Sequence, residues 1–174
     1  MQYQISFFSP NGNAENLACS YKQILPSLTP MVDLRKEAAL HTADTYLVGF
    51  EFPGTSLDRI PEQVQKFMAQ LDNKKILLFA TTPLADEEDA YIRAEAALQV
   101  CLPAKCDYLG LFLCQGEVDS ALIMKLMLDS AMDPHNRKLR HELSLCKKAK
   151  KHPNRQDTRM ACRFLVQALR LEYF

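Results

Sequence analysis

Short apolar runs, each followed by a segment with helical spacing, are the feature that most limits what this chain can fold into. The clearest run lies within KKILLFATT, residues 74–82, whose central residues ILLFA are all apolar. Such runs are typical of strands in the middle of a parallel sheet, which is covered on both faces. The pattern predicts five strands, over residues 3–8, 29–34, 45–52, 74–82 and 106–116.

The segments between these strands carry apolar residues at helical spacing. Helices are expected over residues 14–25, 56–71, 85–100 and 156–171, with at best a short helix over 36–43 and a helix or turn region over 118–132. In the segment 56–71, Ser56 is a candidate N-cap, and Pro61 is tolerated only in the first turn, so the regular helix can start there.

Strands that alternate with helices long enough for crossovers predict one fold class. It is a doubly wound, five-stranded parallel sheet with helices on both faces, a three-layer α/β/α architecture. At 174 residues, we expect positions 1–174 to form one domain of this kind.

Composition and charge narrow the class of protein. Lys plus Arg and Asp plus Glu number 21 each, so net charge gives no reason to expect a nucleic-acid or membrane partner. No apolar stretch is long enough to span a bilayer, and MQYQISFF lacks the basic start and cleavage site of a signal peptide, so we expect a cytoplasmic protein. The six cysteines form no CxxC pair and the histidines share no helical face, which favours free thiols and no metal site.

Sheets of this type bind ligands outside the carboxyl ends of their strands, where the strand order reverses. We therefore expect the loops that start near Ser9, Pro53 and Thr82, and the loop after Gly116, to lie along one rim. The sequence shows no Ser-His-Asp order and no Walker motif, so nothing favours hydrolysis or kinase chemistry. We expect no catalytic side chain.

Five segments, in chain order, carry a resemblance to the flavodoxin family. FFSPNGNAENLA (7–18) resembles the family's phosphate loop, and HTADTYLVGFEFPG (41–54) is similar to its third strand and first flavin loop. KKILLFATTPLA (74–85) resembles the fourth strand and the start of the second flavin loop, and YLGLFLCQGEV (108–118) the fifth strand. KKHPNRQDTRMACRFLVQAL (150–169) is similar to the signature that opens the last helix. The resemblance implies a short-chain flavodoxin domain with FMN as cofactor.

The resemblance assigns a divergent phosphate loop. Ser9 matches its first hydroxyl and Gly12 its glycine, Asn11 replaces the second hydroxyl, Asn13 follows, and Ala14 replaces the third hydroxyl. A phosphate would still meet backbone N–H groups, two Asn amides and the positive end of a helix. Each lost hydroxyl bond to a charged phosphate is worth about 1.5–3 kcal/mol, so losing two weakens FMN roughly a hundredfold or more. The segment is either a working phosphate site or a plain turn.

The resemblance also implies residues around the flavin ring. Phe52, Pro53 and Gly54 belong to the first flavin loop, and Thr81 and Thr82 begin the second. Tyr91 is a candidate for stacking on the ring, with a position on a helix that covers the sheet as the alternative.

Two charged runs each allow more than one interpretation. The acidic run 86–89 is a solvated helix start, or it creates negative potential beside the flavin, or it is a docking patch for a basic partner. The basic cluster 147–155 is either a solvated loop or a contact for an acidic partner.

Two functions follow from the resemblance. The first is an FMN-binding electron-transfer protein that serves a partner reductase. The alternative is an accessory or interaction module with a degenerate flavin site that binds no FMN or binds it weakly, as in the accessory flavodoxins encoded beside bacterial reductases. Both describe a redox carrier or a reductase accessory subunit rather than a stand-alone enzyme.

Overall fold

Five parallel strands form the centre of the computed structural model, which describes residues 2–171. In chain order they are β1 (Tyr3–Phe8), β2 (Met31–Asp33), β3 (Thr45–Glu51), β4 (Lys75–Thr81) and β5 (Asp107–Cys114). Their spatial order is β2-β1-β3-β4-β5, so the order reverses beside β1. The predicted doubly wound parallel sheet is confirmed.

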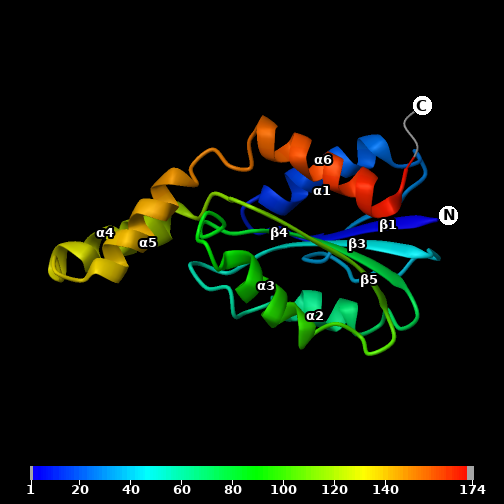
Figure 1. Cartoon of the computed structure of the whole chain (residues 1–174), viewed down its shortest axis with the longest axis horizontal. Coiled ribbons are helices and arrows are strands. Elements are labelled where there is room, and N and C mark those ends of the chain that lie inside the picture. Colours follow the sequence, from blue (N-terminus) through cyan, green and yellow to red (C-terminus); the bar gives the residue numbers. More distant parts are fainter. Residues whose placement is uncertain (1, 172–174) are drawn as a thin grey trace.

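Helices cover both faces of this sheet (Figure 1). The helices α1 (Asn13–Ile24) and α6 (Arg155–Leu169) lie on one face, and α2 (Glu62–Met68) and α3 (Ala90–Gln99) on the other. Each of the five predicted strands is present, and α1 and α6 lie where their periodicity predicted them.

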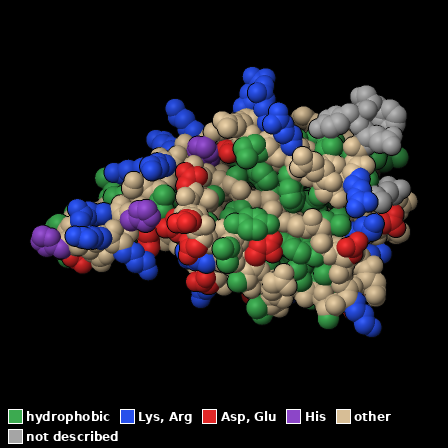
Figure 2. All heavy atoms as spheres, in the orientation of Figure 1, with side chains coloured by type: hydrophobic (Ala, Val, Ile, Leu, Met, Phe, Trp, Pro, Cys, Tyr) green, Lys and Arg blue, Asp and Glu red, His purple; other side chains and the backbone are tan. Residues whose placement is uncertain are grey.

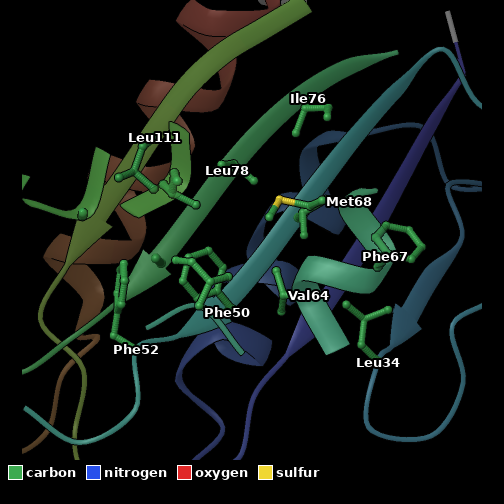
Figure 3. Close-up of a cluster of buried hydrophobic side chains, with 14 of the residues drawn as sticks. Leu34, Phe50, Phe52, Val64, Phe67, Met68, Ile76, Leu78 and Leu111 are labelled. Atoms are coloured by element: carbon green, nitrogen blue, oxygen red, sulfur yellow. The ribbon is translucent and has the colours of Figure 1, made fainter. Parts of the chain in front are cut away.

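Strand β4 is apolar at consecutive positions because its side chains pack alternately into the cores on the two faces of the sheet. Ile76 and Leu78 pack into the core under α2 and α3, while Leu77 and Phe79 pack into the core under α1 and α6. Figure 3 shows the first of these cores, in which side chains from β3, β4 and α2 meet. Because both faces are covered, neither alternate set of residues can be polar.

Several expected boundaries differ in the structure. Residues 36–43 form no helix. Helix α2 begins at Glu62 with Pro61 as its N-cap, which is the start beside Pro61 that the sequence allowed, so Ser56 is not its N-cap. The helix expected from residue 85 begins only at Ala90, which leaves the acidic run before it. Proline at the start of α2 removes an N–H that would otherwise lack a partner, which explains the later start.

A helical hairpin that the sequence did not predict as such follows β5. It pairs α4 (Ser120–Met132) with α5 (Arg137–Lys148) and projects from the body of the domain (Figure 1). Helix α5 lies in a basic segment where no helix was expected. Leu139, Leu143 and Cys146 do recur there at helical spacing, so an amphipathic signal was present, and α4 supplies the surface against which they pack.

Within residues 2–171, no helix is both long and apolar enough to pass through a membrane. The same residues contain no group of three or more His, Cys, Asp or Glu side chains that could hold a metal ion. All six cysteines are free, as the spacing predicted.

Candidate functional site

Four loops at the carboxyl ends of the strands meet around a cleft of about 450 Å³. They follow β1, β3, β4 and β5, the four loops that the sequence placed on one rim. The cleft is lined by Phe8, Pro10, Asn11, Asn13, Glu51, Phe52, Pro53, Gly54, Pro61, Thr81, Thr82, Pro83, Gly116, Glu117, Val118, Asp119 and Leu122. A ligand in this cleft would therefore touch the carboxyl ends of β1, β3 and β4 and the loop after β5.

The loop between β1 and α1 turns its donors toward one point. Gly12 has φ +85°, a conformation that glycine adopts without strain, and it precedes the first residue of α1. This turn leaves the backbone N–H groups of Asn11 and Asn13 free of helix partners and directed to the same acceptor. The Ser9 hydroxyl and the Asn11 side-chain amide reach the same place.

The acceptor at that place is the carboxylate of Glu51, the last residue of β3. Its Oε1 accepts from Ser9 Oγ at 2.5 Å and from Asn13 N at 2.9 Å. Its Oε2 accepts from Asn11 N at 3.1 Å and from Asn11 Nδ2 at 2.9 Å. Glu51 is only 5% exposed, so a buried carboxylate is held by four donors of a single loop. We call these four donors, on Ser9, Asn11 and Asn13, the anion cradle.

Neighbouring elements hold the cradle in position. The Arg35 guanidinium donates to the Ser9 carbonyl at 2.6 Å, and Ser9 Oγ accepts from Glu15 N at 3.0 Å. On the other side, Asn13 Nδ2 donates to the Glu117 carbonyl at 2.7 Å. The anion cradle is thus tied both to the loop after β2 and to the loop after β5.

Gly116 permits this close approach. A Cβ on Gly116 would lie 2.6 Å from Thr81 Cβ and 3.1 Å from Asn13 Nδ2. Both contacts are closer than side-chain carbons normally come. A side chain at this position would push apart the loops after β1, β4 and β5.

Charge in the cleft is one-sided. The lining includes three carboxylates, on Glu51, Glu117 and Asp119, and no Lys, Arg or His. Arg35 lies behind the cradle, where it makes a bond with Asp33 at 2.7 Å and lowers the pKa of that carboxyl. The cleft therefore has anion-binding donors but no mobile cation that could accompany a second anion.

The donor set fits a phosphate. Backbone N–H groups, a hydroxyl and an amide that converge on one point at a helix N-terminus are the donors that phosphates meet in proteins. The Glu51 carboxylate acts in this structure as the stand-in for such an anion. A phosphate can use the same donors only if that carboxylate leaves them.

The walls for a planar ring are only partly those expected. Pro53, Gly54, Thr81 and Thr82 all line the cleft. Phe52 also reaches it, but its ring is 3% exposed and packs edge-to-face on Phe50, with centroids 5.0 Å apart. Phe52 therefore offers a ligand little accessible surface.

The first turn of α4 adds a wall that the sequence did not indicate. Leu122 lines the cleft, and its Cδ2 lies 3.8 Å from where a Cβ on Gly54 would be. The hydroxyl of Thr55 also donates to Glu142 of α5 at 3.2 Å. The helical hairpin is therefore bonded to the loop after β3, and its residue Leu122 forms part of the cleft wall.

Tyr91, Ala14 and Gly12 are expected site residues that do not line the cleft. Tyr91 sits on α3, about half exposed, and donates to Glu95, which also accepts from Tyr108 at 2.7 Å. This was the alternative position for Tyr91, so in this arrangement it would not stack on a ring in the cleft. Ala14 is fully buried in the core under α1 and offers the cleft nothing, while Gly12 shapes the loop without lining the cleft.

The acidic run also lies outside the cleft lining. Glu87 joins α3 to the hairpin, through Arg93 at 3.2 Å and His141 at 3.1 Å. The other three acids of residues 86–89 are exposed. This arrangement agrees with the solvated helix start and gives no sign of direct contact with a bound ring.

Glu51 is the residue that sequence reasoning missed, although a signal was present. It is the one charged residue in the run TYLVGFEF, and such a residue in a buried strand needs buried partners. The register pairs Phe8 with Phe50, which sets Glu51 beside Ser9 at the next position. A buried acid next to a donor-rich loop predicts the contact that the structure has.

Comparison with known proteins gives three kinds of match. The profile of the family described as "Flavodoxin domain" matches residues 4–166. The flavodoxin-like domain-containing protein BilS of Clostridioides difficile (strain CD3) is 25% identical over 121 residues, 70% of this chain and 67% of that protein.

Among solved structures, oxidised flavodoxin 2 from Bacillus cereus aligns with TM-score 0.45 and 14% identity, over 96% of this chain and 99% of that one. A putative flavoprotein from Bacteroides uniformis ATCC 8492 aligns with TM-score 0.47 and 14% identity, over 72% of this chain and 97% of that one.

Proposed function

We propose that this chain, which belongs to the flavodoxin domain family, is an FMN-binding electron-transfer protein that serves a partner reductase. One observation carries the proposal: the anion cradle opens onto a cleft of about 450 Å³ at the carboxyl edge of the sheet. When bound, FMN would supply the transfer of one or two electrons.

The chain's own residues would bind and orient the flavin. The donors of Ser9, Asn11 and Asn13 would hold its phosphate once Glu51 has moved away. The prolines Pro53 and Pro83 and the side chain of Leu122 offer apolar surface for the ring, because all three line the cleft. Electron transfer through a bound flavin needs no side chain that reacts.

A flavin titration tests this proposal. We expect the purified protein to quench the fluorescence of added flavin, or to shift its visible spectrum, with a dissociation constant below tens of micromolar. The absence of any change with either FMN or riboflavin at that concentration would contradict it.

The Glu51 carboxylate favours a second candidate, an accessory module that binds FMN weakly or not at all and acts through a partner protein. Because the donors of the anion cradle already bind the Glu51 carboxylate, a phosphate gains less binding free energy from them. This candidate requires a surface for the partner, and the helical hairpin provides one.

The hairpin surface is an apolar groove of about 800 Å³ along α4. Met124, Met127 and Leu128 line it and are 64%, 49% and 63% exposed. Lys147 and Lys150 border it, and Figure 2 shows basic side chains gathered over the hairpin. The groove therefore suits a partner that presents an apolar ridge flanked by acidic side chains.

The groove also adjoins the cleft. Glu117 and Val118 line both, so a partner seated on α4 would lie at the rim where a flavin would bind. Electron transfer would require a short distance between the bound flavin and the redox centre of the partner. The same surface thus serves either candidate function.

An amphipathic helical peptide with Leu on one face and Glu beside it is a probe for the groove. We expect it to bind, and the same peptide with Lys in place of Glu not to bind. Met127→Lys should abolish binding, whereas Met160→Lys, at a methionine of similar exposure (51%) on α6, should not. Equal binding of both peptides, or no effect of Met127→Lys, would contradict a groove for acidic partners.

A further inference from the structure

We infer that Glu51 is a specificity-determining residue, an internal competitor that denies the anion cradle to the phosphate of FMN. The inference rests on the proposed function, because it takes the cleft as a site for a flavin ring. It goes further in naming the ligand class that the protein can bind with Glu51 still in the cradle, a flavin whose side chain carries no charge.

The cradle has room for one anion only. Its four donors all converge on the two oxygens of Glu51, and the donors of Asn11 and Asn13 are those that a phosphate would need. Ser9 and Asn13 are buried, so they have no second acceptor in solvent to turn to. A phosphate and the carboxylate therefore exclude one another from the same donors.

Charge opposes a shared site as well. A phosphate that entered beside Glu51 would meet a like charge in a partly dehydrated position, where screening by water is weak. The carboxylates of Glu117 and Asp119 add to the same sign in the cleft. Arg35 lies near enough to interact with Glu51, but its guanidinium is already paired with Asp33 and donates to the Ser9 carbonyl, so it only partly offsets a second anion.

A flavin without a phosphate meets neither obstacle. Riboflavin can place its ring against Pro53 and Leu122 and leave Glu51 in the cradle. FMN must first displace Glu51, and the free energy spent on that step offsets what its phosphate gains from the same donors. In the natural protein the phosphate should therefore add little affinity.

The test compares FMN with riboflavin by quenching of flavin fluorescence. In the natural protein we expect dissociation constants within about threefold of each other. In Glu51→Gln the charge is gone and one oxygen becomes an N–H group that faces other donors, so the side chain leaves the cradle. FMN should then bind at least tenfold more tightly, which corresponds to about 1.4 kcal/mol, with riboflavin changed less than threefold.

Glu87→Gln is the matched control. It also removes a partly buried carboxylate, but that carboxylate lies outside the cleft lining and pairs with Arg93 at 3.2 Å and His141 at 3.1 Å. Its ratio of FMN to riboflavin affinity should stay within threefold of the natural protein. Glu51→Ser, purified with phosphate present, replaces Glu51→Gln if the latter does not fold.

Two results would overturn the inference. One is a natural protein that already binds FMN a hundredfold more tightly than riboflavin, and the other is an unchanged ratio in Glu51→Gln. If neither flavin binds any variant, the proposed function fails, but the competition is still measurable with inorganic phosphate alone. Phosphate should then raise the urea midpoint of Glu51→Gln and not that of the natural protein, and an equal response would refute the competition.

Discussion

Replacing Gly116 by alanine should destabilise the protein more than the same replacement at a glycine of the site with positive φ. The added Cβ would lie 2.6 Å from Thr81 Cβ and 2.7 Å from Thr81 Oγ1. Thr81 is 1% exposed, and a Cβ cannot rotate away, so the backbone at the end of β4 or in the loop after β5 must move.

The magnitude follows from two contributions. Forced overpacking of a buried site costs about 1–3 kcal/mol. The shift also weakens the bond from Asn13 Nδ2 to the Glu117 carbonyl, which is worth about 1 kcal/mol. Together Gly116→Ala should lower the free energy of unfolding by about 2–4 kcal/mol, or the midpoint temperature by roughly 5–15 °C for a chain of this size.

Gly54→Ala is the control for this prediction. Gly54 has φ +63°, so alanine there carries backbone strain of about 1–2 kcal/mol, but its Cβ would meet only Leu122 Cδ2 at 3.8 Å. Urea and thermal unfolding of both variants measure the difference. A Gly116→Ala protein as stable as Gly54→Ala, or more stable, would refute the packing of the three loops described here.

Three further predictions concern acid stability, thiol reactivity and the ring wall. Asp33→Asn should cost about 0.5–1 kcal/mol near neutral pH. Because Arg35 lowers the folded-state pKa of Asp33, the contribution of Asp33 is complete above its unfolded pKa of about 3.9 and disappears as the pH falls through the lower folded value, so the two urea curves should converge in acid. Cys19 is exposed, whereas burial raises the pKa of the Cys146 thiol to about 11, so a thiol reagent at pH 7.5 should label Cys19 at least tenfold faster by peptide mass mapping. Tyr91→Ala should change riboflavin affinity less than twofold, and a loss of tenfold or more would return Tyr91 to the ring wall.

Much of the fold could be predicted from the sequence because strand burial leaves a local signal. The runs that became β3 and β4 are apolar at consecutive positions, and only a sheet covered on both faces requires that. The hairpin was harder. Its helix α5 does carry apolar residues at helical spacing, Leu139, Leu143 and Cys146, so that helix could have been predicted; its pairing with α4 could not, because that contact is not local.

The candidate site could also be predicted only in part from the sequence. The rim could be located from strand ends, because parallel strands bring their carboxyl ends to one edge. That Glu51 occupies the anion cradle could not be predicted, because the contact depends on the pairing register of β1 and β3, which sets Glu51 beside Ser9. The sequence left two positions open for Tyr91, and the choice depends on a contact that is not local: Glu95 accepts from both Tyr91 of α3 and Tyr108 of β5.

The contact between Glu51 and the loop is the central claim, and amide NMR during flavin titration tests it most directly. We expect saturating FMN to shift the backbone amide signals of Asn11 and Asn13 as their acceptor changes from carboxylate to phosphate. Riboflavin should leave both signals in place while it shifts those of cleft residues such as Leu122. Binding of FMN that leaves the Asn11 and Asn13 amides unmoved would contradict the account.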